Sequence, residues 1–237
     1  MKGETKMRDL TLTARGYLLI ALVLVVSLAF SSSAQALSIK IWDHIHPALV
    51  IDDNGLEDDS ALSGGIAYSG SLGIFNFIVA GGVSKPEIGS KTLPNMDLSL
   101  QVKSTATGSL QIELSDPNFG PLATGYGLHN QIGGTTWGSL TFKTYFDISN
   151  TLFAHTTEIA SLGPFTGPFS GDKASSVVPG PNEYPYSLTL TADIITPANK
   201  TTSFDAEVYP TPEPGTILLL GLGLLGLGVF GRKKMGA

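Results

Sequence analysis

The feature that most constrains the fold is a strict alternation of apolar and polar residues between Asn95 and Ser104. The apolar positions alternate with polar ones, which are Asp97, Ser99, Gln101 and Lys103. Successive side chains of a β-strand point to opposite faces, so the segment predicts a half-buried strand. Ser109–Ser115 repeats the pattern after a Thr107-Gly108 turn. The two segments together predict an antiparallel hairpin.

Similar short patterns recur along the body of the chain, residues 37–209. We expect further strands at Leu37–Trp42, Ala48–Ile51, Gly65–Tyr68, Leu72–Ala80, Gly138–Ile148, Thr151–Ile159, Tyr186–Ile195 and Thr201–Tyr209. The last two would form a closing hairpin across Pro197–Asn199. Asp116-Pro117-Asn118 is expected to break the pattern. Phe119–Gly134 is expected to be irregular, with one short strand near Ala123–Leu128, and Ser161–Pro185 to be a long loop.

The composition supports an all-β fold. The chain has 28 glycines and 14 prolines, and 14% of its residues are charged, which favours short strands and turns over a helical bundle. We predict an antiparallel β-sandwich, either jelly-roll-like or immunoglobulin-like, flanked by an N-terminal signal helix and a C-terminal transmembrane helix. These patterns leave the strand order open.

The N-terminus is typical of a secretory signal peptide. Four basic residues precede the 14-residue apolar segment Tyr17–Phe30, and Ala34 and Ala36 form the small-x-small pattern that signal peptidase cleaves. We therefore assign residues 1–36 to a signal peptide cut after Ala36. The alternative is an uncleaved anchor, which a segment shorter than about 20 residues disfavours.

The C-terminus has three parts in a fixed order. Pro212, Glu213 and Pro214 come first, then an uncharged apolar run over residues 216–231, and last the basic cluster Arg232, Lys233 and Lys234. Basic residues beside an apolar span stay on the cytoplasmic side of a membrane. We predict a proline-rich spacer at 210–215, a transmembrane segment at 216–231 and a basic cytoplasmic tail at 232–237.

This three-part tail resembles the PEP-CTERM sorting signal of bacterial exported proteins. The resemblance covers about the last tenth of the chain and implies processing by an exosortase, a membrane transpeptidase-like enzyme. It further implies sorting across the envelope of a Gram-negative bacterium that makes exopolysaccharide. We expect a precursor anchored in the inner membrane and a mature form at the cell surface or outside the cell. The alternative is an ordinary C-terminal membrane anchor.

The exported body is acidic and lacks cysteine. Residues 37–231 contain 7 lysines and 18 acidic residues, a net charge of −11. That charge disfavours nucleic acid and anionic lipid as partners. The absence of cysteine from the chain excludes thiol nucleophiles, iron–sulfur clusters and cysteine-ligated zinc.

An acidic loop at residues 52–59 is the candidate metal site. Its carboxylates would repel one another unless they were solvated or bridged by a cation, and calcium prefers such oxygen ligands. The predicted ligands are Asp52, Asn54, Glu57 and Asp59. The spacing does not match an EF-hand. The alternative is a solvated turn at Asn54-Gly55.

Histidines and aromatic residues form two weaker candidates. His44 and His46 would face the same way on a strand and could share a metal, or they could be two surface histidines. His129 and His155 stand alone and are expected to be structural or exposed. Four rings could line a sugar-binding face, although core positions are favoured for them: Trp42, Trp137, Tyr126 and Tyr145.

No catalytic motif is present in the sequence, so we expect a protein that is not an enzyme. The hypothesis that fits both ends is a structural or adhesive matrix protein associated with exopolysaccharide. One alternative is a surface-presented carbohydrate-binding module, which exposed aromatic residues on one sheet face would support. Another is a secreted hydrolase, which a deep pocket with two close carboxylates would support.

Overall fold

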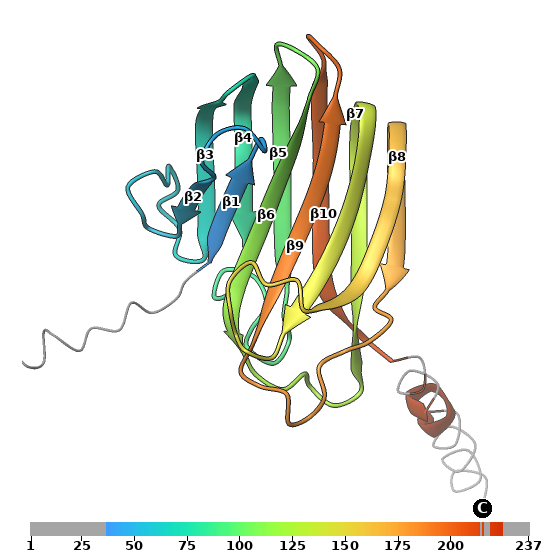
Figure 1. Ribbon diagram of the computed structural model, residues 1–237. Helices are drawn as coiled ribbons and strands as arrows, with labels where there is room; N and C mark the ends of the chain where they lie inside the picture. Colours follow the sequence, from blue (N-terminus) through green and yellow to red (C-terminus); the bar gives the residue numbers. More distant parts are fainter. Residues whose placement is uncertain (1–36, 214, 216–218, 225–237) are drawn as a thin grey trace, which may run out of the picture. The chain divides into compact units, whose positions relative to one another are not determined.

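The computed structural model describes residues 37–213, 215 and 219–224, and the described part is almost entirely β-structure (Figure 1). The predicted signal peptide with Ala34 and Ala36 lies outside the described residues, as do Pro214, the basic cluster 232–234 and most of the predicted transmembrane segment. The strands are β1 (Ser38–Trp42), β2 (Leu49–Asp52), β3 (Gly65–Leu72), β4 (Phe75–Val83), β5 (Met96–Ser104), β6 (Gly108–Phe119), β7 (Tyr126–Asp147), β8 (Thr157–Ala174), β9 (Tyr186–Thr196) and β10 (Thr201–Pro212).

These strands form one antiparallel sheet, so the all-β prediction is confirmed. Their order is β2-β1-β6-β9-β7-β10-β5-β4-β3, and β8 pairs with β7. The sheet folds over itself and is nearly closed, because its outermost strands β2 and β3 approach each other. A side chain at Gly82 of β4 would collide with Leu114 of β6, so these two strands face each other across the core.

Both predicted hairpins are wrong. β5 pairs with β4 and β10, whereas β6 pairs with β1 and β9. β9 and β10 are likewise separated in the sheet by β7. The strands of each predicted hairpin lie in different halves of the folded sheet, with β2, β1, β6 and β9 on one side of β7 and β10, β5, β4 and β3 on the other, and both halves bury their apolar residues in one core. Each short turn therefore carries the chain from one half of the sheet to the other.

β7 links the two halves of the sheet. It includes residues up to Gly134 that the sequence predicted to be mostly irregular. Its first part, residues 126–135, pairs with β10, and its second part, residues 139–147, pairs with β9. Between them, a Cβ at Gly138 would collide with the carbonyl oxygen of Ile195. Glycine at this position therefore allows the strand to pass closely from one half to the other.

Two further segments expected to be irregular also belong to strands. β8 continues to Ala174, well into the predicted loop Ser161–Pro185, and among the described strands it pairs with β7 alone. Its prolines, Pro164 and Pro168, are tolerated because an edge strand needs donors on one side only. β6 likewise resumes after an irregularity between Asp116 and Phe119.

One apolar core fills the space between the two halves of the sheet. Alternate residues of almost every strand contribute to it, including Met96, Leu98, Leu100 and Val102 of the strand with the clearest sequence pattern. The remaining alternate residues of that strand lie on the outer face. The alternation thus determines which side chains are available for a site on the outside of the sheet.

Candidate functional site

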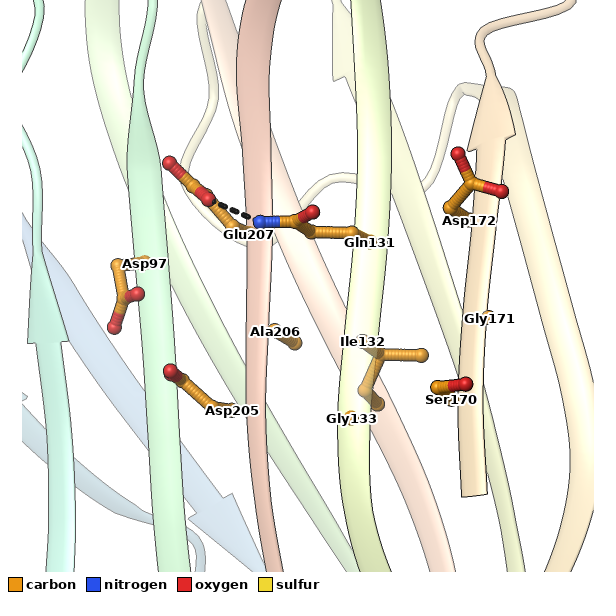
Figure 2. A pocket seen from close by; sticks show the side chains of 10 residues that line it. All are labelled: Asp97, Gln131, Ile132, Gly133, Ser170, Gly171, Asp172, Asp205, Ala206 and Glu207. Carbon is orange, nitrogen blue, oxygen red and sulfur yellow. Dashed lines mark hydrogen bonds between the residues drawn. The ribbon is translucent and has the colours of Figure 1, made fainter.

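A groove of about 590 Å³ lies on the outer face of β5, β10, β7 and β8 (Figure 2). We call it the acidic groove because four of its lining residues are carboxylic acids. It is lined by Asp97, Gln131, Ile132, Gly133, Ser170, Gly171, Asp172, Asp205, Ala206 and Glu207.

Strand register brings these residues together from distant parts of the sequence. Asp97 pairs with Glu207, Glu207 with Gln131, and Gln131 with Asp172. The four side chains form a row across four adjacent strands. Each next residue along these strands points to the opposite face, and Leu98, Ala206 and Ile132 accordingly belong to the core.

A second row of residues lies beside the first, and its glycine leaves the acidic groove hollow. This row runs from Ser99 through Asp205 and Gly133 to Ser170. A Cβ added at Gly133 would find only the Phe169 carbonyl oxygen within 4 Å, at 3.9 Å. The missing side chain thus leaves open space. A second hollow of about 330 Å³ continues from here over β5 and β4.

Hydrogen bonds hold the carboxylates of the acidic groove in place. The Ser99 hydroxyl lies 3.2 Å from Asp97 Oδ1 and 2.9 Å from Asp205 Oδ1 and can donate to either. The Gln131 amide donates to Glu207 Oε2 at 2.7 Å (Figure 2). Burial raises the pKa of the Asp97 carboxyl, and the charge of Asp205 raises it further, to about 6.

The groove offers mainly hydrogen-bond acceptors to a ligand. Its lining includes four carboxylic acids and no lysine, arginine or histidine. Ionised carboxylates accept hydrogen bonds and repel anions. Asp205 and Gln131 are exposed, so a ligand can reach them from solvent. The surface therefore suits a neutral or cationic ligand rich in O–H or N–H donors.

His129 lies at the rim of the groove, beside one of the carboxylates that line it. Its Nε2 lies 2.6 Å from Asp172 Oδ2, and its ring centroid is 5.5 Å from that of Tyr209. Asp172 is thus shared between the groove and this pair. His129 and Tyr209 occupy paired positions on β7 and β10, one row beyond Gln131 and Glu207.

The end of β10 leads from the groove into the C-terminal tail. β10 continues to Pro212, three residues beyond the predicted strand, and Pro212 pairs with Tyr126 of β7. The backbone N–H of Glu213 then donates to the Gly125 carbonyl at 2.8 Å. Residues 219–224 are helical. Among the described residues, no helix combines the length and the apolar character that a membrane span requires.

The same tail matches a family of sorting signals. Residues 210–234 match the PEP-CTERM protein-sorting motif. The chain ends in a PEP-CTERM motif. The match includes both Pro212–Pro214 and the basic cluster Arg232–Lys234. The PEP-CTERM motif marks an exported protein sorted by an exosortase, and it says nothing about the activity of the β-domain.

A comparison with curated protein sequences finds no match, and the structural similarities outside the PEP-CTERM motif are weak. A TmCBM61 structure with β-1,4-galactotriose has 9% identity and a TM-score of 0.30, covering 61% of this chain and 92% of that one. The mannan-recognising module TmCBM27 has 10% identity and a TM-score of 0.30, covering 61% and 88%. The exo-1,3/1,4-β-glucanase ExoP from a Pseudoalteromonas species has 11% identity and a TM-score of 0.34, covering 76% and 20%.

The predicted calcium ligands have separate partners and do not converge. Asp52 accepts the Ser38 hydroxyl at 2.6 Å, Asn54 donates its side-chain amide to Asp53, and Asp59 accepts the Ser69 hydroxyl. Glu57 is exposed. Within the part of the chain that the structure describes, no group of three or more His, Cys, Asp or Glu side chains is arranged for a metal. Calcium binding by this loop stays a prediction.

Two other loop carboxylates cap backbone groups. Asp58 Oδ1 accepts the N–H groups of Ser60 and Ala67, at 2.9 and 3.0 Å. Asp53 Oδ2 accepts that of Gly64 at 2.9 Å. These bonds fold the acidic loop onto the start of β3, which gives the dense run of carboxylates a structural use.

His44 and His46 do not face the same way on a strand. His44 has a positive φ of 63°, which ends the extended backbone after β1. Its ring packs against Trp42, with centroids 4.1 Å apart, whereas His46 Nδ1 lies 2.7 Å from Asp43 Oδ2. Each histidine therefore has its own neighbour.

The four aromatic residues proposed for a sugar-binding face are neither in the core nor in the groove. Trp137 is 63% exposed beneath the Lys200 ammonium, which lies 4.0 Å from its ring centroid, and Trp42 is also exposed. Tyr145 stacks on His155 with centroids 4.4 Å apart, and Tyr126 is half-buried at the start of β7. The core prediction is wrong for all four rings.

The residues of the acidic groove were absent from the predicted site. The signal that points to them is the polar half of the alternation, with Asp97 and Ser99 in β5 and Asp205 and Glu207 in β10. Alternation predicts that each pair faces outward. Their convergence depends on the pairing of β5 with β10, which is not encoded in either segment alone.

Proposed function

We propose that this protein is exported, processed by an exosortase at its PEP-CTERM motif, and displayed at the cell surface or in the extracellular matrix, where the acidic groove binds exopolysaccharide. Before processing, the apolar segment 216–231 would anchor the precursor in the inner membrane. The domain would then have a structural or adhesive role and no catalytic one. The observation that carries this proposal is the open, acceptor-rich groove on a protein with a PEP-CTERM sorting motif.

The chemistry of the groove fits a polysaccharide better than a compact ligand. Sugar hydroxyls are donors, and the row of Asp97, Glu207, Gln131 and Asp172 offers acceptors across four strands. Adjacent strands are about 4.8 Å apart, so the row spans about 14 Å. This length is sufficient for several sugar units of an extended chain to contact the sheet.

The test is co-sedimentation of the intact protein with exopolysaccharide from its own host, compared with the Gly133→Leu variant. A leucine at this position projects into the hollow of the groove without a close contact at its Cβ. We expect the wild-type protein to bind and the variant to lose most of its binding. Thermal unfolding of both proteins shows whether the substitution affects the fold.

Gly127→Leu is a matched control on the same strand. A Cβ at Gly127 has nothing within 4 Å, and this residue does not line the acidic groove. The control variant should bind as the wild type does. Equal binding by the Gly133→Leu and wild-type proteins, or no binding by the wild type, would refute the proposed role of the groove.

Glycoside hydrolysis is a second candidate function, and one observation favours it. Asp97, beside the carboxyl group of Asp205, has a raised pKa of about 6, and a raised carboxyl pKa is typical of the general acid of a glycosidase. The exposure of Asp205 favours binding over catalysis. Release of reducing ends from the host polysaccharide by the wild type, abolished in Asp97→Asn, would establish hydrolysis instead.

The proposal includes a finer description of the fold. The two facing halves of the sheet support a β-sandwich. The supporting feature is the strand order, in which consecutive strands β5 and β6, and likewise β9 and β10, lie in opposite halves. Such connections between facing sheets occur in both jelly-roll-like and immunoglobulin-like sandwiches.

A further inference from the structure

The Pro-Glu-Pro triplet begins inside the folded domain. Pro212 is the last residue of β10 and pairs with Tyr126, and Glu213 is bound through its N–H to the Gly125 carbonyl. The sequence predicted a free spacer at 210–215, but its first half is part of the sheet. The segment that an exosortase must read is therefore also a segment of this domain.

Pairing at this end of β10 is one-sided. β10 pairs with β5 only as far as Val208, whereas its pairing with β7 continues to Pro212. Residues 209–212 thus depend on β7 alone for their sheet hydrogen bonds. Next to them is a hollow of about 260 Å³, lined in part by Gly127, Leu128 and residues 174–178. The end of β10 is consequently the least covered part of the strand.

The hydrogen-bond donors of the triplet are already in use. Proline has no backbone N–H, so Glu213 carries the single backbone donor of Pro212-Glu213-Pro214. That donor is bound to Gly125 at 2.8 Å. A partner that binds an extended peptide by adding it to a sheet uses main-chain hydrogen bonds. The Gly125 carbonyl, just before β7, already accepts the hydrogen bond of the Glu213 N–H, which such a partner would need as a donor.

We propose that β7 and the exosortase compete for residues 210–213, so that the end of β10 must separate from β7 before the motif is processed. The inference rests on the proposed processing by an exosortase and adds a requirement to it. One-sided pairing makes the separation local, since β10 can stay paired with β5 and β7 up to Val208 while its last residues open. The folded domain thereby controls access to its own sorting signal.

A disulfide between β7 and the end of β10 tests this requirement in the full chain. Gly127 and Thr211 are register partners, a Cβ at Gly127 has open space, and the chain has no cysteine of its own. Directly paired residues of an antiparallel sheet are about 4.5–5.5 Å apart at Cα, within the range for disulfides. Gly127→Cys with Thr211→Cys should therefore cross-link in the oxidising compartment outside the inner membrane.

Processing is followed by pulse–chase and intact mass in cells that express the exosortase, with thiol labelling to identify the oxidised chains. We expect the oxidised double variant to lose processing and to regain it on reduction, and the Gly127→Cys single variant to be processed as the wild type. Lys103→Cys with Thr201→Cys, a register pair at the other end of β10, is the matched control. Its cross-link leaves the motif free, so it should be processed normally.

A second variant tests the opposite change. A Gly-Ser-Gly-Ser insertion between Tyr209 and Pro210 removes the motif from the ladder with β7 and should speed processing. Processing of the oxidised Gly127–Thr211 cross-link at the wild-type rate would overturn the inference, as would an insertion that leaves the rate unchanged or slows it. Failure of the wild type itself to be processed would instead overturn the proposed sorting function.

Discussion

Asp97 and Asp205, far apart in the sequence, both lie within hydrogen-bond distance of the hydroxyl group of Ser99. A single hydroxyl donates one hydrogen at a time, so it cannot donate a full hydrogen bond to both carboxylates at once. The unfavourable interaction between them is one reason, after burial, why the pKa of Asp97 rises to about 6. The acidic groove is therefore a place where the folded protein holds charges together at a cost to its stability.

We expect Asp97→Asn to stabilise the protein at neutral pH. The pKa of Asp97 rises from 3.8 to about 6 on folding, so its favourable contribution exists at low pH and is lost as pH rises through about 6. Asparagine has no ionisable carboxyl group, so the Asp97→Asn variant does not lose this stability as pH rises. Thermal unfolding between pH 4 and 8 should show that the Tm advantage of the variant grows with pH.

Glu57→Gln is the charge-matched control for that measurement. Glu57 is an exposed residue of the acidic loop, outside the groove, and its replacement removes one negative charge without relieving the groove. It should leave the pH dependence of the Tm unchanged. If the Tm values of the wild type and of Asp97→Asn changed in parallel with pH, Asp97 would ionise normally in the folded protein, and the prediction would be wrong.

Lys40→Met should destabilise the domain. Glu113 is fully buried on β6, where its carboxylate forms an ion pair with Lys40 of β1. Its Oε1 also lies 2.5 Å from Nε2 of His155. Removal of Lys40 leaves a buried carboxylate with one partner, which costs about 3 kcal/mol in comparable buried pairs. Urea unfolding at neutral pH measures the loss. Lys103→Met, at an exposed position, should change stability by less than about 0.5 kcal/mol.

Gly138→Ala should destabilise the domain through a backbone collision. A Cβ at Gly138 collides with the Ile195 carbonyl, and relief of this contact requires β7 and β9 to move apart where β7 passes between the halves. We expect a loss of about 2 kcal/mol. Gly133→Ala, with open space at the Cβ, should be close to neutral in the same thermal unfolding experiment. Equal effects of the two substitutions would contradict the crossover geometry.

Replacement of Pro212, Glu213 and Pro214 by alanine should leave the precursor unprocessed. The reason is that the PEP-CTERM match includes this triplet. Fractionation and intact mass of the envelope protein follow the outcome. Alanine replacement of the exposed triplet Pro181, Asn182 and Glu183 is the control for loss of proline and charge elsewhere. Normal maturation of the first variant would contradict exosortase sorting.

Local sequence pattern predicted the fold class and the faces of the best strands. The alternation in Met96–Ser104 identifies both the core residues and the outward polar residues of β5, because side-chain direction has a period of two. It could not predict the partners of β5. Short turns suggested hairpins with β6, and likewise of β9 with β10, but burial of two apolar faces against each other outweighed adjacency in the chain.

The sequence predicted the sorting motif but missed the acidic groove, again because a local pattern does not reveal which strands pair. The PEP-CTERM motif is contiguous, so the sequence reveals it completely. The acidic groove combines Asp97, Gln131, Asp172 and Glu207 from four strands. Its assembly depends on long-range register, and the Gly-Pro repeats of β8 concealed a strand that edge pairing allows. Acidic density alone pointed instead to the loop at Asp52–Asp59, where several carboxylates cap backbone groups.

β10 connects the groove directly to the sorting signal. Glu207 lines the groove, and Pro212 lies five residues further along the same strand, about 17 Å of extended chain. If the groove binds a polymer as proposed, a pull on the polymer spreads over the four strands of the groove and reaches the tail along β10. The bonds of β10 to its neighbours resist such a force together, in shear, instead of one after another. In mechanical terms the four strands of the groove share the load, and β10 transmits it to the tail.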